Sequence, residues 1–172
     1  MKLANGKISL SATDLSNYLS CKHLTQLNRK HANNEIERPE RKNRFLERII
    51  DRGLEHEAAY IKHLKADASV SVVEFEYKEA NVKEKTLKAM QKGVNIIAQG
   101  ALANDCWSGR PDLLIKTNTP SPLLGEWSYE VADTKLTKTT KAGTNFTTVR
   151  LFRNDHRDAE PRTRKNVRNY AR

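Results

Sequence analysis

Residues 109–116 read G-R-P-D-L-L-I-K, and residues 129–136, after a loop, read Y-E-V-A-D-T-K-L. Each apolar run carries an acid, Asp112 in the first and Asp133 in the second, and Lys135 follows two residues later. Side chains alternate between the faces of a strand, so Asp133 and Lys135 point the same way. If the two runs pair as neighbouring strands, Asp112 meets them at one point. The stretch therefore predicts a sheet edge that carries two carboxylates and a lysine.

Two carboxylates that converge at such an edge can hold a hard divalent cation, because Mg²⁺ is typically bound by one or two carboxylates together with waters and substrate phosphate. The cation polarises a phosphoryl oxygen, and a nearby lysine can orient the nucleophile or stabilise charge. Two acids and a lysine also occur together as ordinary surface ion pairs, so this alternative stays open. The position of both acids inside apolar runs favours the catalytic interpretation.

Short sequence motifs occur in and around this stretch in a fixed order, from Ser11 to about Gly143. They are S-A-T-D-L, C-K-H-L-T, R-G-L-E-H-E, Q-G-A-L, W-S-G-R-P-D-L-L and Y-E-V-A-D-T-K-L. Together they resemble the RecB-like branch of the PD-(D/E)XK nuclease superfamily. The resemblance implies a restriction-endonuclease-like α/β core, in which helices flank a mixed, mostly antiparallel sheet. That core would be incomplete at its carboxyl end.

The resemblance also implies an activity and a set of site residues. The activity is that of a divalent-metal-dependent deoxyribonuclease of exonuclease type, acting on single-stranded DNA or duplex ends with Mg²⁺ or Mn²⁺. The metal ligands would be His56, Asp112, Asp133 and the backbone carbonyl of Thr134. Asp112, Asp133 and Lys135 would be catalytic. The helical pattern alone favours a core or boundary histidine at position 56, and the resemblance reverses that preference.

Cys21 has two interpretations. As a lone cysteine at the edge of an apolar stripe it is explained as a small buried thiol. In the resembled family a cysteine here is the first ligand of a 4Fe–4S cluster. A cluster needs about four thiolates, whereas the chain has two cysteines, and Cys106 does not match the family's other ligands. We expect a cluster only in a full-length form.

The charge of the chain favours a polyanionic partner, because 31 basic and 21 acidic residues give a net charge of +10. Arg110, Lys138 and Lys141 are the candidates for nucleic-acid contacts, although the two lysines also suit a solvated loop. A basic nucleic-acid-binding module without catalysis is the second functional hypothesis. Few cysteines, no secretory signal and no long apolar run predict a cytoplasmic protein without a membrane partner.

Local patterns predict the elements around these residues. Ser11 and Asp14 fit a capping box, and Gly93 fits a helix C-cap. The expected helices cover residues 11–30, 44–65 and 79–92, and the expected strands cover residues 70–77, 94–102, 107–116 and 127–136. Side chains of the second helix expected to face inwards are Phe45, Ile49, Leu54, Tyr60, Ile61 and Leu64. Glu55 and Glu57 are expected in solvent.

Residues 145–172 differ from the rest, with eight basic and three acidic residues and no helical apolar period. One interpretation is a disordered basic arm that grips nucleic acid. The other is a slip of reading frame, since a one-nucleotide shift from Asn145 can encode an amphipathic helix with Q-x-x-x-Y, which the resembled family carries here. We therefore divide the chain into a partial nuclease domain, 1–144, and an out-of-frame, disordered tail. Truncated in this way, it could be an inactive descendant of a nuclease.

Overall fold

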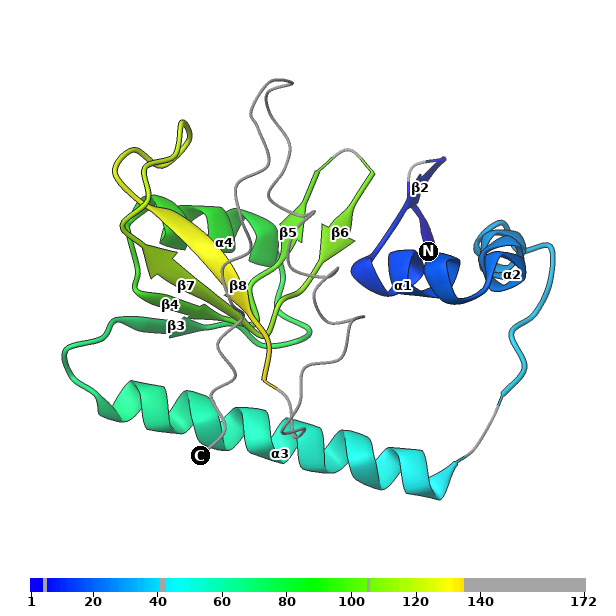
Figure 1. Ribbon diagram of the computed structural model, residues 1–172, viewed down its shortest axis with the longest axis horizontal. Coiled ribbons are helices and arrows are strands. Elements are labelled where there is room, and N and C mark those ends of the chain that lie inside the picture. The colour runs from blue at the N-terminus through cyan, green and yellow to red at the C-terminus, as the bar shows by residue number, and fades with distance from the viewer. Residues whose placement is uncertain (5, 41–42, 105, 135–172) are drawn as a thin grey trace. The chain divides into compact units, whose positions relative to one another are not determined.

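The structure is a computed structural model, and it describes residues 1–4, 6–40, 43–104 and 106–134 (Figure 1). In this described part the fold is mixed α/β, with four helices and short, mostly antiparallel strands. It divides into two compact units, which we describe separately. Among the described residues, the first contains Met1–Pro39 and Ala103–Gly109, and the second contains residues 40–102 and 110–134.

The first unit contains two small two-stranded sheets. Its strands are β1 (Lys2–Ala4), β2 (Lys7–Ser9), β6 (Ser108–Gly109) and β5 (Leu102–Ala103), of which Leu102 is assigned to the second unit. Leu10 joins the two sheets, because its N–H donates to the Cys106 carbonyl at 2.7 Å and its carbonyl accepts from the Ser108 N–H at 2.8 Å. Asn104 lies between β5 and β6, and its side-chain oxygen accepts a hydrogen bond from the Trp107 N–H at 2.9 Å.

Helix α1 (Ala12–Ser20) begins at the predicted capping box. The Asp14 N–H donates to Ser11 Oγ at 3.3 Å, and the Ser11 N–H donates back to Asp14 Oδ2 at 2.8 Å. The Met1 amine donates to the same buried carboxylate at 2.7 Å. Burial by itself raises the pKa of Asp14, but the hydrogen bonds from the amine and Ser11 outweigh it, so the pKa lies below its usual value.

Helix α2 (Lys22–Ala32) follows α1 after a break, so the prediction of one continuous helix is wrong. Cys21 has extended backbone angles, φ −157° and ψ 106°, and its N–H closes α1 by donating to the Asn17 carbonyl at 2.8 Å. The Ser20 hydroxyl donates to the Ser16 carbonyl at 2.9 Å. Side-chain bonds of this kind bend helices, and a pattern of apolar residues does not reveal them.

The second unit contains a four-stranded sheet between two helices. Its elements are α3 (Arg44–Ala66), β3 (Val72–Glu74), α4 (Val82–Gln91), β4 (Ile96–Ala98), β7 (Leu113–Thr117) and β8 (Ser128–Ala132). The strand order is β3-β4-β7-β8, in which β3 and β4 are parallel and the other two pairs are antiparallel. Parallel neighbours need a crossover, which α4 supplies. The predicted mixed sheet flanked by helices is confirmed, while its likeness to restriction endonucleases stays a prediction.

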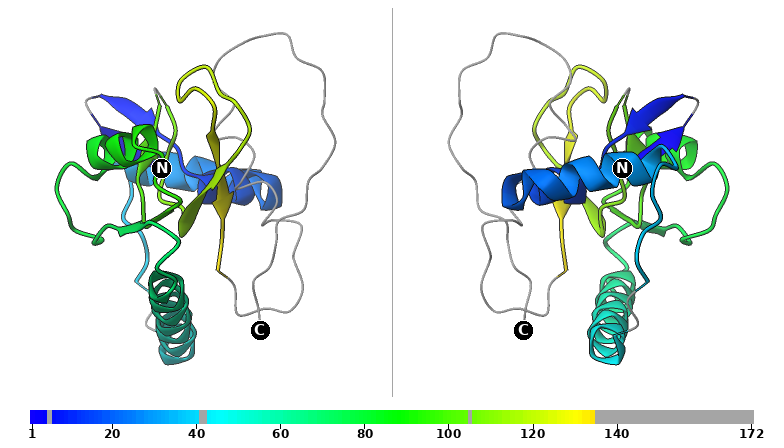
Figure 2. Two further views of the ribbon diagram at one scale, coloured as in Figure 1. Left: turned by 90° about the vertical axis from the view of Figure 1, so that its left-hand side faces the viewer. Right: turned by 90° about the vertical axis from the view of Figure 1, so that its right-hand side faces the viewer.

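Each face of this sheet packs against one helix, and Figure 2 shows α3 end-on below the strands. On one face Tyr60, Ile61 and Leu64 of α3, all predicted to face inwards, pack against the sheet residues Ile96, Ala98 and Leu113. On the other face Ile97 and Leu114 belong to the cluster that includes α4. Neighbours in a strand alternate between the two clusters, as extended backbone requires.

The amino-terminal half of α3 leaves its apolar side chains exposed. The sequence predicts Phe45, Ile49 and Leu54 in the interior, but their exposed fractions are 73%, 47% and 60%. Helix α3 is longer than the sheet it covers, and its amino-terminal half extends past the strands (Figure 1). A helical period identifies the apolar face but not how far the packing partner extends. Among the described helices, none has the length and apolarity needed to cross a membrane.

Gly93 and Gln99 have positive φ angles, and each lies at the end of a secondary-structure element. Gly93, at φ +70°, ends α4 as predicted: its N–H donates to the Met90 carbonyl at 3.0 Å, and the Val94 N–H donates to the Ala89 carbonyl at 3.3 Å. Gln99 adopts φ +54°, which ends β4. The predicted strand over residues 94–102 is therefore divided into β4 and β5. The predicted strand over residues 107–116 is likewise divided into β6 and β7.

Replacing Leu114, which has no exposed surface, by Ala should lower the free energy of unfolding by about 2–5 kcal/mol, because it leaves a cavity opposite Ile97. Urea unfolding followed by circular dichroism measures the change. The matched control is Leu123→Ala, since Leu123 is 83% exposed and its loss should change stability by less than about 0.5 kcal/mol. Equal effects of the two substitutions would contradict the assigned core.

Asp14→Asn should destabilise the first unit by about 1 kcal/mol, because it weakens the capping box. The folded pKa of Asp14 is lowered, so its contribution is complete above the unfolded pKa and is lost as the pH falls through the folded pKa. The free energy of unfolding should therefore fall less steeply from neutral to acidic pH in the variant than in the wild type. Glu37→Gln, at an exposed carboxylate of the same unit, is the control and should leave the dependence unchanged.

Candidate active site

Asp112 and Thr134 meet at one edge of the four-stranded sheet. Asp112 immediately precedes β7, and Thr134 lies two residues after the end of β8. The antiparallel register pairs Leu113 with Ala132, so both positions lie at the same edge. Thr134 donates twice to Asp112 Oδ2, from its N–H at 2.8 Å and from its hydroxyl at 3.1 Å. The structure therefore brings Asp112 together with Thr134, the central residue of the D-T-K motif.

The other residues predicted in this segment are described only in part. Asp133 is half-buried and makes an interaction of its own. Lys135, Lys138 and Lys141 lie outside the described residues, as do the domain boundary at residue 144 and the tail that follows it. The roles assigned to these residues stay predictions.

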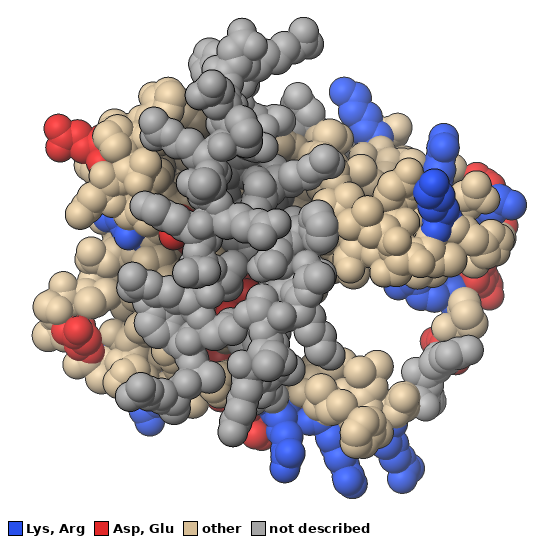
Figure 3. Space-filling model, in the orientation of Figure 1, with Lys and Arg blue, Asp and Glu red and all other residues tan. Residues whose placement is uncertain are grey.

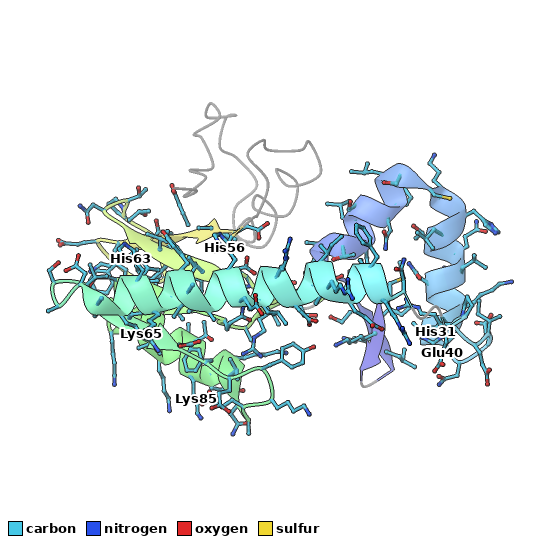
Figure 4. All side chains as sticks on the ribbon, turned by 90° about the horizontal axis from the view of Figure 1, so that it is seen from below. His31, Glu40, His56, His63, Lys65 and Lys85 are labelled. Carbon is cyan, nitrogen blue, oxygen red and sulfur yellow. The ribbon has the colours of Figure 1, made fainter. Side chains whose placement is uncertain are left out.

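His56 projects from the same side of α3 as His63, and Lys65 projects from the opposite side (Figure 4). The His56 side chain is half-buried, and its Nε2 atom is buried without a hydrogen-bond partner in the described structure. A buried polar atom without a partner costs about 1–3 kcal/mol. Imidazole nitrogen is among the commonest protein ligands for metals. Both its burial and its chemistry therefore suit His56 to the ligand role that the sequence predicts.

Two of the predicted ligands have donor types that bind divalent cations. Asp112 supplies a carboxylate and His56 supplies a buried ring nitrogen. Across the part of the chain that the structure describes, no group of three His, Cys, Asp or Glu side chains is placed to hold one ion. The predicted set also includes the Thr134 carbonyl, and Mg²⁺ commonly completes its shell with waters and substrate phosphate. The full ligand set stays a prediction.

Gln99 connects α3 to the residue that precedes β7. The Gln99 N–H donates to the Asp112 carbonyl at 2.9 Å. Its Nε2 donates to the Glu57 carboxylate, next to His56 in α3, and its Oε1 accepts from Arg110 Nε at 3.2 Å. Its left-handed backbone, φ +54°, is uncommon outside glycine. Backbone held in such a conformation is found preferentially at functional sites.

Arg110 binds carbonyls of the chain itself. Its Nη1 donates to the Tyr77 carbonyl at 2.9 Å, and its Nη2 donates to the carbonyls of Glu76 at 2.7 Å and Phe75 at 3.2 Å. The guanidinium also lies 5.4 Å from the centroid of the Tyr77 ring. These bonds fix the segment that follows β3, a role that the sequence analysis missed. Direct contact between Arg110 and nucleic acid stays a prediction.

Glu57 has an environment that the sequence analysis assigned wrongly. Glu55 is exposed as expected, but Glu57 is half-buried and bonded to Gln99. Residues four apart lie on the same face of a helix, so Glu57 shares the face of Ile61, which packs on the sheet. That spacing was the signal available in the sequence.

Both cysteines, Cys21 and Cys106, are exposed free thiols. The interpretation of Cys21 as a buried thiol is therefore wrong. Its side chain lies at the junction of α1 and α2, where the backbone is extended. The expectation of a 4Fe–4S cluster in a full-length form stays a prediction.

Comparisons with family models, with curated proteins and with solved structures give no match for this chain.

Gln99→Glu should lower the free energy of unfolding by about 1–3 kcal/mol, because it places a second carboxylate against Glu57 and removes a hydrogen bond. Adding Glu57→Gln should restore most of the loss, since an amide then faces a carboxylate again and Arg110 keeps its acceptor. Urea unfolding measures both changes. Gln91→Glu, at an exposed glutamine of α4, makes the same charge change and should have little effect. A double variant no more stable than Gln99→Glu would contradict the network.

Proposed function

We propose that this chain is a divalent-metal-dependent nuclease that hydrolyses DNA phosphodiester bonds, related to the RecB-like branch of the PD-(D/E)XK nucleases. The observation that carries the proposal is the pair of hydrogen bonds from Thr134 to the Asp112 carboxylate. They join the P-D step to the D-T-K segment at one sheet edge, directly before Lys135 in the sequence. The buried, unpartnered Nε2 of His56 supports a metal ligand on α3.

Each residue has a distinct role in this proposal. His56, Asp112, Asp133 and the Thr134 carbonyl would hold Mg²⁺ or Mn²⁺, which when bound polarises a phosphoryl oxygen and lowers the pKa of water. Both described hydrogen bonds to the Asp112 carboxylate end on Oδ2, so Asp112 would remain able to act as a ligand through its carboxylate. Lys135 would orient the attacking water and stabilise the charge that develops on the phosphate.

The choice of DNA rests on the resemblance and on charge. The net charge of +10 suits a polyanion. Lys and Arg side chains project along the lower edge of the face in Figure 3, where Figure 1 places α3. The exposed basic residues of α3 are Arg44, Arg48, Arg52, Lys62 and Lys65. The same charge supports a second candidate, a nucleic-acid-binding module without catalysis.

Mn²⁺-dependent cleavage separates the two candidates. The 172-residue chain should degrade labelled single-stranded or duplex DNA with Mn²⁺ and lose this activity with chelator. Asp112→Asn and Lys135→Ala should each reduce the rate by at least about a hundredfold, because each removes charge needed in the transition state. Asp67→Asn, at an exposed aspartate outside the site, is the matched control and should keep the wild-type rate.

A second chain, encoded with the reading frame shifted after Thr144, is tested beside the first. Cleavage by that chain alone would make the 172-residue chain an inactive derivative of a nuclease. Salt-sensitive DNA binding that ignores chelator and the Asp112 substitution, with no cleavage by either chain, would favour the binding module instead.

A further inference from the structure

Tyr77 is an exposed aromatic side chain with a fixed position. It lies three residues after the end of β3 and is 80% exposed. Most tyrosines in folded proteins bury much of their ring, because the ring is large and apolar. The backbone of this one is nevertheless held, since the Tyr77 carbonyl accepts a hydrogen bond from Arg110 Nη1 at 2.9 Å.

Arg110 packs against the Tyr77 ring. Its guanidinium lies 5.4 Å from the ring centroid on one side of Tyr77. Its own position is fixed by bonds to three carbonyls and to the side chain of Gln99. A cation at a tyrosine ring attracts it through the ring quadrupole. The residue thus presents an ordered aromatic surface to solvent.

This surface is tied to the edge that carries Asp112. Only Pro111 separates Arg110 from Asp112, and two residue steps span at most about 7 Å between Cα atoms. Gln99 closes the connection, because it accepts from Arg110 and its N–H donates to the Asp112 carbonyl. The bonds that hold Tyr77 and those that hold Asp112 therefore belong to one network.

We infer that Tyr77, supported by Arg110, is a stacking site for one unpaired base of a nucleic-acid strand whose backbone passes the edge at Asp112. This inference rests on the proposed function for its substrate class and specifies it as an unpaired strand. Every base has an aromatic face, so stacking on a tyrosine tolerates any sequence. A base inside a duplex is already stacked on its neighbours and does not fit this site.

The Tyr77 side chain itself carries no charge, which separates stacking from attraction to phosphate. Glu76 and Lys78 flank it in the sequence, and Glu79 pairs with Lys85 at 2.5 Å. Binding through phosphates weakens as salt rises, because it depends on the release of counterions. The contribution of Tyr77 should therefore depend on the base and not on salt.

The test measures binding by fluorescence anisotropy in the presence of chelator, so that no strand is cut. The probes are an oligothymidine of about ten nucleotides, within the usual range of single-strand sites, an abasic strand of equal length and a blunt duplex. Tyr77→Ala should weaken binding of oligothymidine about tenfold, equally at low and raised salt, and leave the other two probes unchanged. Tyr77→Phe keeps the ring and should bind within about twofold of the wild type.

Phe45→Ala is the matched control, because it also removes a largely exposed ring from this unit, one that is 73% exposed. It should leave oligothymidine binding unchanged. Urea unfolding of each variant shows that its fold is intact. The inference is overturned if Tyr77→Ala binds oligothymidine like the wild type, if the abasic strand loses as much affinity, or if the wild-type chain does not bind oligothymidine.

These outcomes are independent of those that test cleavage. Base-dependent binding through Tyr77 without Mn²⁺-dependent cleavage by either chain would leave the inference standing and reject the nuclease. Cleavage that needs Asp112, combined with unchanged binding by Tyr77→Ala, would reject the stacking site alone.

Discussion

The antiparallel ladder between β7 and β8 is the constraint on which the candidate site depends. It pairs Leu113 with Ala132 at one end and Thr117 with Ser128 at the other. A slip of one residue would turn every side chain to the opposite face, and the burial of Leu113 and its neighbours in the core prevents it. The same register leaves the residue before β7 beside the chain that follows β8. Apolar packing thus fixes the place where the polar groups meet.

The residues of the Q-G-A-L motif, 99–102, have structural roles in this fold. Gln99 takes the left-handed conformation that ends β4 and bonds to Asp112. A Cβ atom on Gly100 would lie 3.0 Å from Thr86 Cγ2 and 3.3 Å from Leu114 Cδ1, so that position has little room for a side chain. The Ala101 N–H donates to the buried Thr86 hydroxyl at 3.0 Å. Contacts with Thr86 of α4 and Leu114 of β7 therefore restrict which residues can occupy this motif.

Features set by neighbours in the chain could be predicted from the sequence, and features set by distant partners could not. The capping box at Ser11, the cap at Gly93 and the bounds of α3 depend on local backbone chemistry. The exposed start of α3 depends on the extent of the sheet, and the hydrogen-bond partner of Glu57 is a glutamine far along the chain, although its spacing to Ile61 already indicated the buried face. For the site, alternation and pairing placed Asp112 against the D-T-K segment. Its bond to Thr134 and the network through Gln99 needed coordinates.

The four-stranded sheet is assembled from two contiguous pieces. One is β3, α4 and β4, and the other is the β7–β8 hairpin; three residue pairs, Ile96 with Ile115 to Ala98 with Leu113, join them. Local opening of a structure costs less free energy than global unfolding. Parting at this short seam would separate Gln99 from Asp112 while each piece kept its own hydrogen bonds. The seam is also where Ile97 and Leu114 meet, and neither has exposed surface. A substitution that loosens this buried contact would therefore disorganise the edge at Asp112 without touching it.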